Sequence, residues 1–442
     1  MGWHVLIRFR ARNFRSLKEE QELSLVASSL KDSPEAVTPV VGLDIGLLRA
    51  AAIYGANASG KSNVIKSLAY MSSAVQNSQR QWAPEGPIPR EPFLLDPQSK
   101  LDSSSFEVDL LLDGARYHYG FTLKDREILE EWLDAYPTGS KPIRRQMWFS
   151  RNGKKFTFGN KMAGDNAVIE RLTRPNSLFL SAAAQNNHAA LLPVYKWFAE
   201  HFSFVPKDRE PLWNETAELC QDDSVKSSLL NILRVADLGV IGMVVRELDF
   251  SERMDKQGRP LDTEVLVKNL FARVRKKAGT FTGKTHAVAL IHKGPAQEGV
   301  TIHEDDESEG TLALLGLLGP ALRATKMGGT IVVDELDASL HPLLALEMIR
   351  LFNDPKLNPR GAQIIFTTHD TNILDRASLR RDQIWFTEKD AEGGTHLYPL
   401  TDFKPRKNEN LERGYLQGRY GAVPFIGSPE FLANLHRDKA VR

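Results

Sequence analysis

The feature that most constrains this chain is the glycine-rich segment Gly55–Ser62, which reads Gly-Ala-Asn-Ala-Ser-Gly-Lys-Ser. It fits the pattern G-x-x-x-x-G-K-[ST], in which glycines let successive backbone N–H groups converge on phosphate oxygens. The mostly apolar run Leu47–Tyr54 precedes it and predicts a buried strand, and an amphipathic helix is expected from about Lys61 to Val75. A strand, a phosphate-binding turn and a helix in this order predict an α/β nucleotide-binding fold.

Each residue type in this turn has an expected role toward a nucleotide. Gly55, Asn57 and Gly60 belong to the backbone cradle. Lys61 would place positive charge on the β- and γ-phosphates, and Ser62 would offer its hydroxyl to Mg²⁺. The amino-terminal end of the following helix adds the positive end of its dipole. We therefore expect ATP and Mg²⁺ as cofactors.

A second apolar strand ends in two adjacent carboxylates. Thr330–Val333 runs directly into Asp334 and Glu335. We assign Asp334 to Mg²⁺, held through water, and Glu335 to the general base that polarises the attacking water. Beside a phosphate-binding turn, such a pair predicts hydrolysis of the nucleotide to ADP and phosphate.

Two segments that follow resemble motifs of ABC-type ATPases. Leu336–Pro342 resembles the D-loop, in which Asp337 is the expected nucleotide-site residue. The strand Gln363–Thr367 leads to His369, which resembles the switch histidine that contacts the γ-phosphate. The resemblance thus implies a second catalytic residue, His369, beside Glu335.

A third segment, Glu307–Thr311, resembles the ABC signature motif at the start of a predicted helix, Leu312–Thr325. Ser308 and Gly310 are the expected phosphate contacts. The segment departs from the usual pattern, because Glu307, Glu309 and Thr311 replace the usual leucine, glycine and glutamine. In the ABC family the signature completes the site of a partner head, so the resemblance implies at least a head-to-head dimer.

Together the motifs resemble the AAA-labelled ABC/SMC-like ATPases of bacterial antiphage systems, including the abortive-infection and OLD (overcoming lysogenisation defect) groups and the ATPase of the PARIS system. The tail Tyr415–Pro424 is similar to tails encoded beside a TOPRIM-type nuclease. The resemblance implies a homo-oligomeric sensor or scaffold that controls a separate effector nuclease and answers a phage trigger protein. No Asp-x-Asp follows His369, so this chain is not expected to be a nuclease itself.

Two alternatives remain open from the sequence. A RecF-like DNA-repair ATPase would clamp DNA across its dimer, and the basic cluster Arg273–Lys277 could contribute to the groove. A transporter ATPase is disfavoured by the diverged signature and by the strand-rich segment Ser105–Phe158. Direct binding of nucleic acid is therefore possible but not required.

Net charge, cysteine content and the length of apolar runs limit the class of protein in which these motifs can occur. The formal net charge of the 442 residues is +1, so no global field attracts nucleic acid or membrane. The single cysteine, Cys220, excludes an internal disulfide framework and a cysteine-based zinc site. No uncharged apolar run has the length of a membrane span, and we expect a cytoplasmic protein.

We expect three parts: residues 1–205 as the amino-terminal half of an ABC-type head with an antiparallel β subdomain, 206–300 as a helical insertion or lid, and 301–442 as the remaining head and tail. Helical periodicity covers Ser224 to about Phe250 and Thr263–Lys277. The sequence contains no sustained heptad run, so we do not expect a long coiled coil. Gln98 is the candidate glutamine-lobe residue, in a segment that otherwise suggests a loop.

Overall fold

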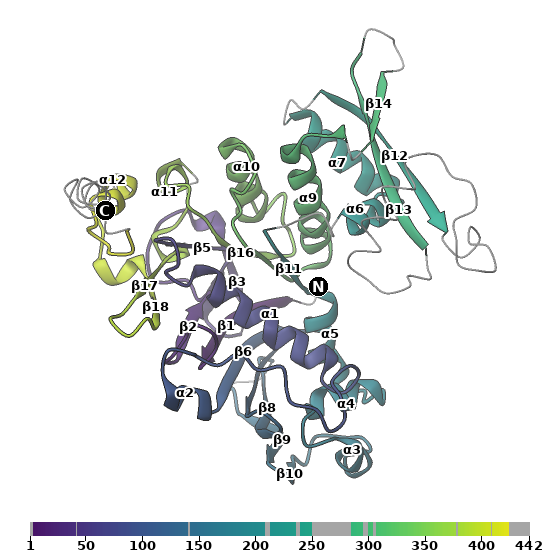
Figure 1. Cartoon of the computed structure of the whole chain (residues 1–442), viewed down its shortest axis with the longest axis vertical. Helices are drawn as coiled ribbons and strands as arrows, with labels where there is room; N and C mark the ends of the chain where they lie inside the picture. Colours follow the sequence, from purple (N-terminus) through teal and green to yellow (C-terminus); the bar gives the residue numbers. More distant parts are fainter. Residues whose placement is uncertain are drawn as a thin grey trace, which may run out of the picture. The chain divides into compact units, whose positions relative to one another are not determined.

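The computed structural model describes residues 3–40, 42–139, 142–207, 213–235, 239–249, 284–294, 299–303, 306–376, 379–407 and 409–423 (Figure 1). The chain forms two compact units. The first comprises Met1–Phe204, Ala324–Asp337 and Ala345–Arg442, and the second comprises Val205–Arg323 and Ala338–Leu344. The predicted basic cluster Arg273–Lys277, and the helix expected there, lie outside the described residues.

A six-stranded sheet forms the centre of the first unit. Its order is β11 (Phe202–Val205), β15 (Thr330–Val333), β16 (Gln363–Thr367), β5 (Ala50–Gly55), β17 (Ile384–Lys389) and β18 (Thr395–Pro399). β15, β16, β5 and β17 are parallel, whereas β18 is antiparallel to β17. All six residues of β5 are buried, as expected for an inner strand covered on both faces.

Helix α1 (Lys61–Asn77) connects this sheet to a second one. Its apolar residues recur at helical spacing, and Val64, Leu68 and Met71 are buried in one hydrophobic core. That core also holds Ile53 from β5 and Phe106 from the second sheet. Helices α3 (Asn166–Leu172), α4 (Phe179–Gln185) and α5 (Leu192–Glu200) complete this layer.

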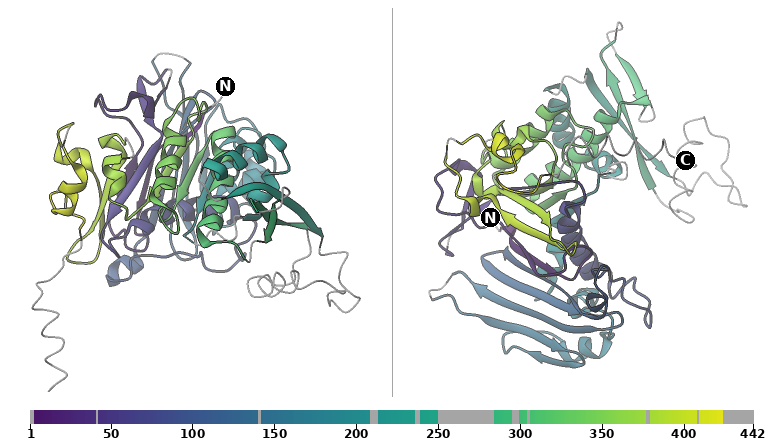
Figure 2. Two further views of the ribbon diagram at one scale, coloured as in Figure 1. Left: turned by 90° about the horizontal axis from the view of Figure 1, so that it is seen from above. Right: turned by 60° about the vertical axis from the view of Figure 1, so that its left-hand side comes forward.

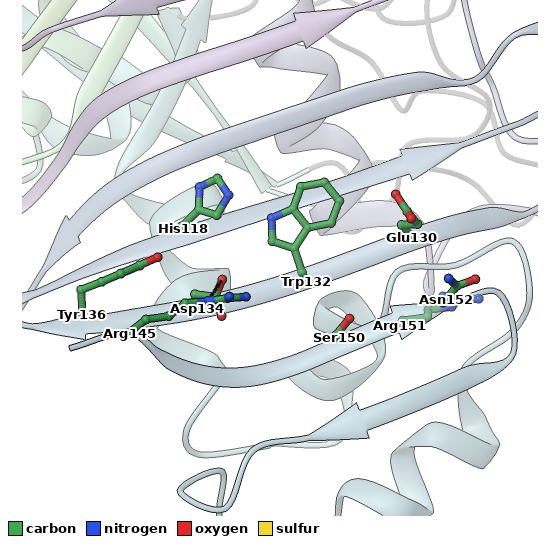
Figure 3. Close-up of a pocket in the computed structure, with 9 residues that line it drawn as sticks. All are labelled: His118, Glu130, Trp132, Asp134, Tyr136, Arg145, Ser150, Arg151 and Asn152. Atoms are coloured by element: carbon green, nitrogen blue, oxygen red, sulfur yellow. Dashed lines mark ion pairs between the residues drawn. The ribbon is translucent and has the colours of Figure 1, made fainter.

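The second sheet is antiparallel and has seven strands, seen side by side in Figure 2. Its order is β10 (Lys155–Phe158), β9 (Gln146–Asn152), β8 (Ile128–Pro137), β7 (Ala115–Leu123), β6 (Ser104–Leu112), β1 (His4–Arg12) and β2 (Gln21–Ser24). One face is apolar and joins the core through residues such as Tyr119, Phe121 and Leu133. The other face carries polar side chains (Figure 3). This alternation is what one buried face produces.

The second unit contains α6 (Trp213–Leu219), α7 (Asp223–Val235), most of α9 (Glu309–Met327), and a sheet of β12 (Val240–Asp249), β13 (Lys284–His292) and β14 (Val300–His303). The predicted helix over Ser224–Phe250 is wrong in its second half, where the chain forms β12. Gly239 has φ of 67°, which ends helical geometry, and the branched run that follows favours a strand.

The predicted fold class is confirmed: the chain has an α/β P-loop fold of the ABC-ATPase head type with an antiparallel β subdomain. In the described part of the chain the longest helix, α9, has 19 residues, so no long coiled coil is present there. Among the same residues, no helix combines the length and apolar character needed to cross a bilayer. The first unit also contains four short elements: η1 (Pro34–Ala36), β3 (Val37–Val40), β4 (Ile45–Leu48) and α2 (Pro97–Leu101).

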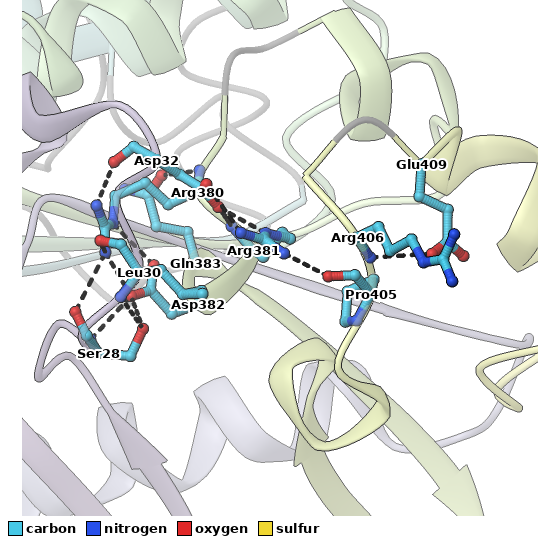
Figure 4. Close-up of polar contacts among 10 residues, drawn as sticks. All are labelled: Ser28, Leu30, Asp32, Arg380, Arg381, Asp382, Gln383, Pro405, Arg406 and Glu409. Carbon is cyan, nitrogen blue, oxygen red and sulfur yellow. Dashed lines mark hydrogen bonds and ion pairs between the residues drawn. The ribbon is translucent and has the colours of Figure 1, made fainter.

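A buried polar cluster ties the segment after β2 to the start of β17 (Figure 4). Arg380 is 2% exposed and pairs with Asp382, whose carboxylate oxygens lie 2.8–2.9 Å from Nη2 and Nε. Arg380 also donates to the backbone carbonyls of Asp32 and Leu30, while Asp382 accepts from the N–H and hydroxyl of Ser28. Arg381 pairs with the carboxylate of Asp32. The cluster fixes the position of β17.

We expect Asp382→Asn to lower the free energy of unfolding by about 3–5 kcal/mol, because it leaves the Arg380 guanidinium buried without its counter-charge. Urea unfolding followed by circular dichroism measures this change. Asp402→Asn, at an exposed carboxylate nearby, is the matched control and should stay within about 0.5 kcal/mol of the wild type. Equal stabilities of the two variants would contradict the assignment.

Candidate functional site

The turn between β5 and α1 comes close to neighbouring backbone and side chains. Gly60 caps α1 in a left-handed conformation with φ of 108°. A Cβ at Gly60 would lie 2.1 Å from Oγ1 of Thr395, and one at Gly55 would lie 2.4 Å from Oγ1 of Thr387. Both positions therefore require glycine, and the turn has the backbone path that a phosphate cradle needs. Asn57 is exposed in this turn.

Hydroxyl groups from distant strands hold the turn in place. Oγ of Ser59 lies 2.7 Å from Oγ1 of Thr387 in β17. Oγ1 of Thr395 in β18 donates to the carbonyl of Ser59 (2.9 Å) and lies 2.8 Å from Oγ of Ser16. Asn63 of α1 donates to the same Ser16 hydroxyl. These supporting residues were not identified from the sequence, because no local motif marks a threonine on a neighbouring strand.

Lys61 is buried and turns back over its own loop. Its ammonium donates to the carbonyls of Gly55 (2.7 Å) and Ala56 (3.0 Å). Burial lowers the pKa of Lys61 to about 8, although the carboxylates of Glu335, Asp337 and Asp334 act in the opposite direction. A phosphate anion bound beside this buried ammonium would favour its protonated, charged form.

Asp334 brings the predicted metal-site residues together. Its Oδ1 accepts hydrogen bonds from the hydroxyls of Ser62 (2.8 Å) and Thr367 (2.9 Å). Its Oδ2 lies 3.8 Å from the ammonium of Lys66. One carboxylate beside a serine hydroxyl fits Mg²⁺, which proteins commonly hold with one or two carboxylates plus phosphate oxygens.

The donor set also argues against a site built wholly from protein ligands. Within the described residues, no group of three or more His, Cys, Asp or Glu side chains could hold a metal ion. Ser62 and Asp334 would therefore hold Mg²⁺ together with the phosphates. Bound there, the ion would neutralise phosphate charge and favour attack on the terminal phosphorus.

Glu335 and His369 follow the carboxyl ends of the neighbouring strands β15 and β16. Glu335 has φ of 51°, an uncommon conformation for a residue with a side chain, and its N–H donates to Oγ1 of Thr367 (2.7 Å). The N–H of His369, an exposed residue, lies 3.3 Å from both carboxylate oxygens of Asp337. The structure thus places Glu335, Asp337 and His369 at the sheet edge that also carries Gly55–Ser62.

Ser308 caps α9 in the second unit. Its exposed hydroxyl accepts the N–H of Thr311 (3.1 Å) and lies 2.8 Å from that residue's Oγ1. Thr311, in the position of the usual glutamine, therefore takes part in the cap. A Cβ at Gly310 would lie 3.1 Å from the carbonyl oxygen of Ser339, in the predicted D-loop. Gly310 thus lets the two segments approach closely.

The unusual Glu307 has a partner that the sequence did not suggest. Its side chain is 4% exposed, and Oε1 lies 2.6 Å from Nε2 of His292 in β13. A buried carboxylate needs such a partner, so His292 allows an acid to replace the usual leucine. The candidate glutamine-lobe residue Gln98 lies in α2, where its amide donates to the carboxylate of Asp102 (3.0 Å) rather than to the phosphate-binding turn.

A phosphate-binding turn follows β5, β15 runs into Asp334 and Glu335, and β16 leads to His369. This arrangement defines an ATPase fold of the P-loop, ABC type. The chain belongs to the family described as "AAA domain, putative AbiEii toxin, Type IV TA system", whose model matches residues 50–375. The fold and family are those of proteins that bind and hydrolyse ATP with Mg²⁺.

Comparison with solved structures finds similar folds at low identity. The SMC head domain from Thermotoga maritima has 14% identity and a TM-score of 0.39, covering 89% of this chain and 98% of that one. The recombination mediator protein RecF-ATPrS has 13% identity and a TM-score of 0.38, with coverage of 89% and 98%. The SmcHead bound to the C-winged helix domain of ScpA has 12% identity and a TM-score of 0.39, with coverage of 89% and 97%. No curated protein matches the sequence.

The lowered pKa of Lys61 makes nucleotide binding depend on pH. Phosphate oxygens raise this pKa, so the protonated site binds more tightly, and affinity should fall as pH rises above about 8. At pH 8.5 we expect binding to take up roughly three-quarters of a proton, and at pH 7 almost none. Calorimetry in two buffers of different ionisation enthalpy measures this uptake. Equal uptake at both pH values would refute the role of Lys61.

Proposed function

We propose that this protein is the ATP-hydrolysing sensor and scaffold of a bacterial antiphage, abortive-infection system. The observation that carries the ATPase part is the shared carboxylate of Asp334, which joins Ser62 of the phosphate turn to Thr367 of the neighbouring strand. Membership of a family described in terms of a putative toxin and a Type IV TA system supports the defence part. The controlled effector is a separate polypeptide, a TOPRIM-type nuclease, and a phage protein is the trigger.

Residues of the first unit divide the work of hydrolysis. Gly55, Asn57 and Gly60 supply backbone around the phosphates, and Lys61 supplies charge. Glu335 accepts the proton of the attacking water, and the hydrogen bond from its N–H to Thr367 fixes the backbone that carries this carboxylate. His369 contacts the γ-phosphate, with its backbone held by Asp337.

The site is completed by the signature segment of a second copy, so the working form is at least a head-to-head dimer. Ser308 is exposed at the amino-terminal end of α9, where a hydroxyl and the helix dipole can meet an anion. The acidic character of the segment is an obstacle to this role. The pairing of Glu307 with His292 reduces it, because that carboxylate is buried and bonded. Asp305 lies outside the described residues.

The tail that suggests an effector also has a structural role. Tyr415 and Tyr420 are 7% and 1% exposed, and both rings stack on Phe386 of β17. Glu412 of α12 (Leu411–Leu416) accepts a hydrogen bond from Thr371, close to His369 in sequence. The tail is therefore anchored beside the proposed nucleotide site, a suitable place from which to report its state to an effector.

We expect Glu335→Gln to lower the ATPase rate by about 10²–10⁴-fold, because it removes the proton acceptor while leaving the binding residues intact. With ATP and Mg²⁺ this variant should retain nucleotide and accumulate as the closed assembly, measured by light scattering on a sizing column. Lys61→Ala should lose nucleotide binding and not assemble. Hydrolysis at the wild-type rate by Glu335→Gln would show that another residue is the base.

A mixing experiment tests the two-copy site directly. Lys61→Ala and Ser308→Arg should each be inactive alone, because one loses the phosphate turn and the other blocks the signature. When the two variants are mixed and then given ATP and Mg²⁺, nucleotide bound at the one intact site should join them into hybrid dimers that regain part of the activity. If the mixture stays inactive while both variants remain folded, the nucleotide is held by a single copy.

The defence role is tested in cells that carry the gene with its genomic neighbours. Phage challenge should arrest infected cells with the wild-type protein and not with Lys61→Ala, and the effector should co-purify with the chain. Salt-dependent DNA binding by the purified protein, combined with sensitivity to DNA damage in cells lacking it, would favour the DNA-repair alternative instead.

A further inference from the structure

The outer face of the seven-stranded sheet carries a hollow of about 480 Å³ that the ATPase mechanism does not use (Figure 3). Strand β8 crosses its centre with Glu130, Trp132 and Asp134 on one face. His118 of β7 lies on one side, and Asn152 of β9 lies on the other. The hollow is open to solvent, so it is a place where another molecule can bind.

Trp132 forms the floor of the hollow. Its indole lies against Gly120, the residue directly opposite on β7. A Cβ at Gly120 would lie 2.4 Å from Cζ2 of the indole, so only glycine allows the ring to cover the neighbouring strand. The indole is half-buried and lines the hollow, with the tilted ring of His118 at 6.2 Å between centroids, so part of it is accessible from the hollow. An aromatic face of this kind attracts a cation or a planar group.

Two carboxylates flank the indole along β8. The Asp134 side chain is 5% exposed, and its Oδ2 lies 2.9 Å from Nε of Arg145. Its Oδ1 is buried and has no hydrogen-bond partner among the described residues. Arg145 itself is 63% exposed, so the carboxylate accepts a guanidinium that remains mostly in solvent. Glu130, on the other side of Trp132, is exposed.

The neighbouring positive charges are already paired within the chain. Arg8 of β1 lies 3.0 Å from Asp109, whose other oxygen is 3.3 Å from Nδ1 of His118. The Arg151 side chain is 3% exposed, and it donates to the carbonyl of Ser177. Within the lining, Arg145 is paired with Asp134, so the carboxylate of the hollow that has no cation beside it is Glu130. Asp134 adds its buried Oδ1, an acceptor without a hydrogen-bond partner among the described residues.

We propose that this hollow binds an arginine side chain presented by another polypeptide. The guanidinium stacks on the accessible part of the Trp132 ring, pairs with Glu130 and donates to the unpartnered Oδ1 of Asp134. Arginine fits better than lysine, because its planar group can stack and bond at the same time. Nucleic acid is disfavoured, because its phosphates would lie beside Glu130 and Asp134.

The proposal goes beyond the proposed ATPase function and does not depend on it. Every residue that forms the hollow belongs to the first unit and lies on β7, β8, β9 or the segment before β9. None of them is among the proposed nucleotide-site residues. Binding at the hollow can therefore be measured on protein without nucleotide, and its failure would leave the ATPase assignment untouched.

The test uses the full chain and an acetylated Gly-Gly-Arg-Gly-Gly peptide, followed by saturation-transfer difference NMR. We expect the arginine Cδ protons to receive the strongest transfer, and a peptide with neutral citrulline in place of arginine to receive almost none. Glu130→Gln should weaken binding roughly three- to tenfold, and Trp132→Ala at least as much. Glu127→Gln, at an exposed carboxylate in the β7–β8 turn, is the matched control and should bind normally.

Several outcomes would overturn the proposal. Equal binding of the citrulline peptide would show that charge is not recognised, and unchanged binding by Glu130→Gln and Trp132→Ala would place the peptide elsewhere. Displacement of the peptide by a single-stranded oligonucleotide would identify a nucleic-acid site. Binding only after removal of residues 424–442 would mean that the chain's own C-terminal segment is the occupant.

Discussion

The carboxylate of Asp334 is the interaction on which the rest of this molecule depends. It accepts hydroxyl hydrogen bonds from Ser62 of α1 and from Thr367 of β16, while it ends β15 itself. One buried charge thus fixes the relative position of three elements that meet at the edge of the parallel sheet. Such a charge is costly to bury unless it is fully bonded or paired with a cation. The same atoms that maintain the fold are those proposed to hold a magnesium ion, so a change at this site would also weaken the sheet.

Local patterns identify the part of the candidate site that a short segment can encode. The turn Gly55–Ser62 and the pair Asp334-Glu335 follow buried apolar strands, and each has a residue order that chemistry restricts closely. Thr387, Thr395 and Ser16 hold the turn as closely as its own residues do, yet they were missed. Thr387 and Thr395 reach the turn through strand order, because β17 and β18 follow it by more than half of the chain and still pack beside it. Ser16 reaches it from the segment between β1 and β2. A sequence without known topology gives no signal for such contacts.

The second unit shows a different limit. Helical periodicity correctly predicts α7 but wrongly predicts a helix over Val240–Asp249, which forms β12. Apolar residues in a short run fit the helical period and the strand period alike. Only Gly239 marks the change from helix to strand. The sequence shows where the signature segment departs from its family pattern. It does not show which residues pair with the substituted side chains. Glu307 is acceptable because His292, on a strand that pairs with two others, reaches it at 2.6 Å. A substitution that breaks a local rule is explained here by a partner that is distant in the chain.

Helix α1 gives the first unit a physical link between its two candidate sites. It begins in the phosphate turn, and its apolar face packs in the same core as the inner face of the seven-stranded sheet. The outer face of that sheet carries Trp132 and its flanking carboxylates. Because close-packed cores transmit displacement, a shift of α1 on nucleotide binding would reach β6, which α1 contacts, and through it the paired strand β7. Contiguous packing connects the proposed nucleotide site to the hollow, but it does not by itself couple binding at the two sites. Coupling requires that α1 or the sheet have two arrangements that differ in their affinity for arginine. The strained backbone of Glu335, next to the carboxylate that contacts α1, is the described feature best placed to separate two such arrangements.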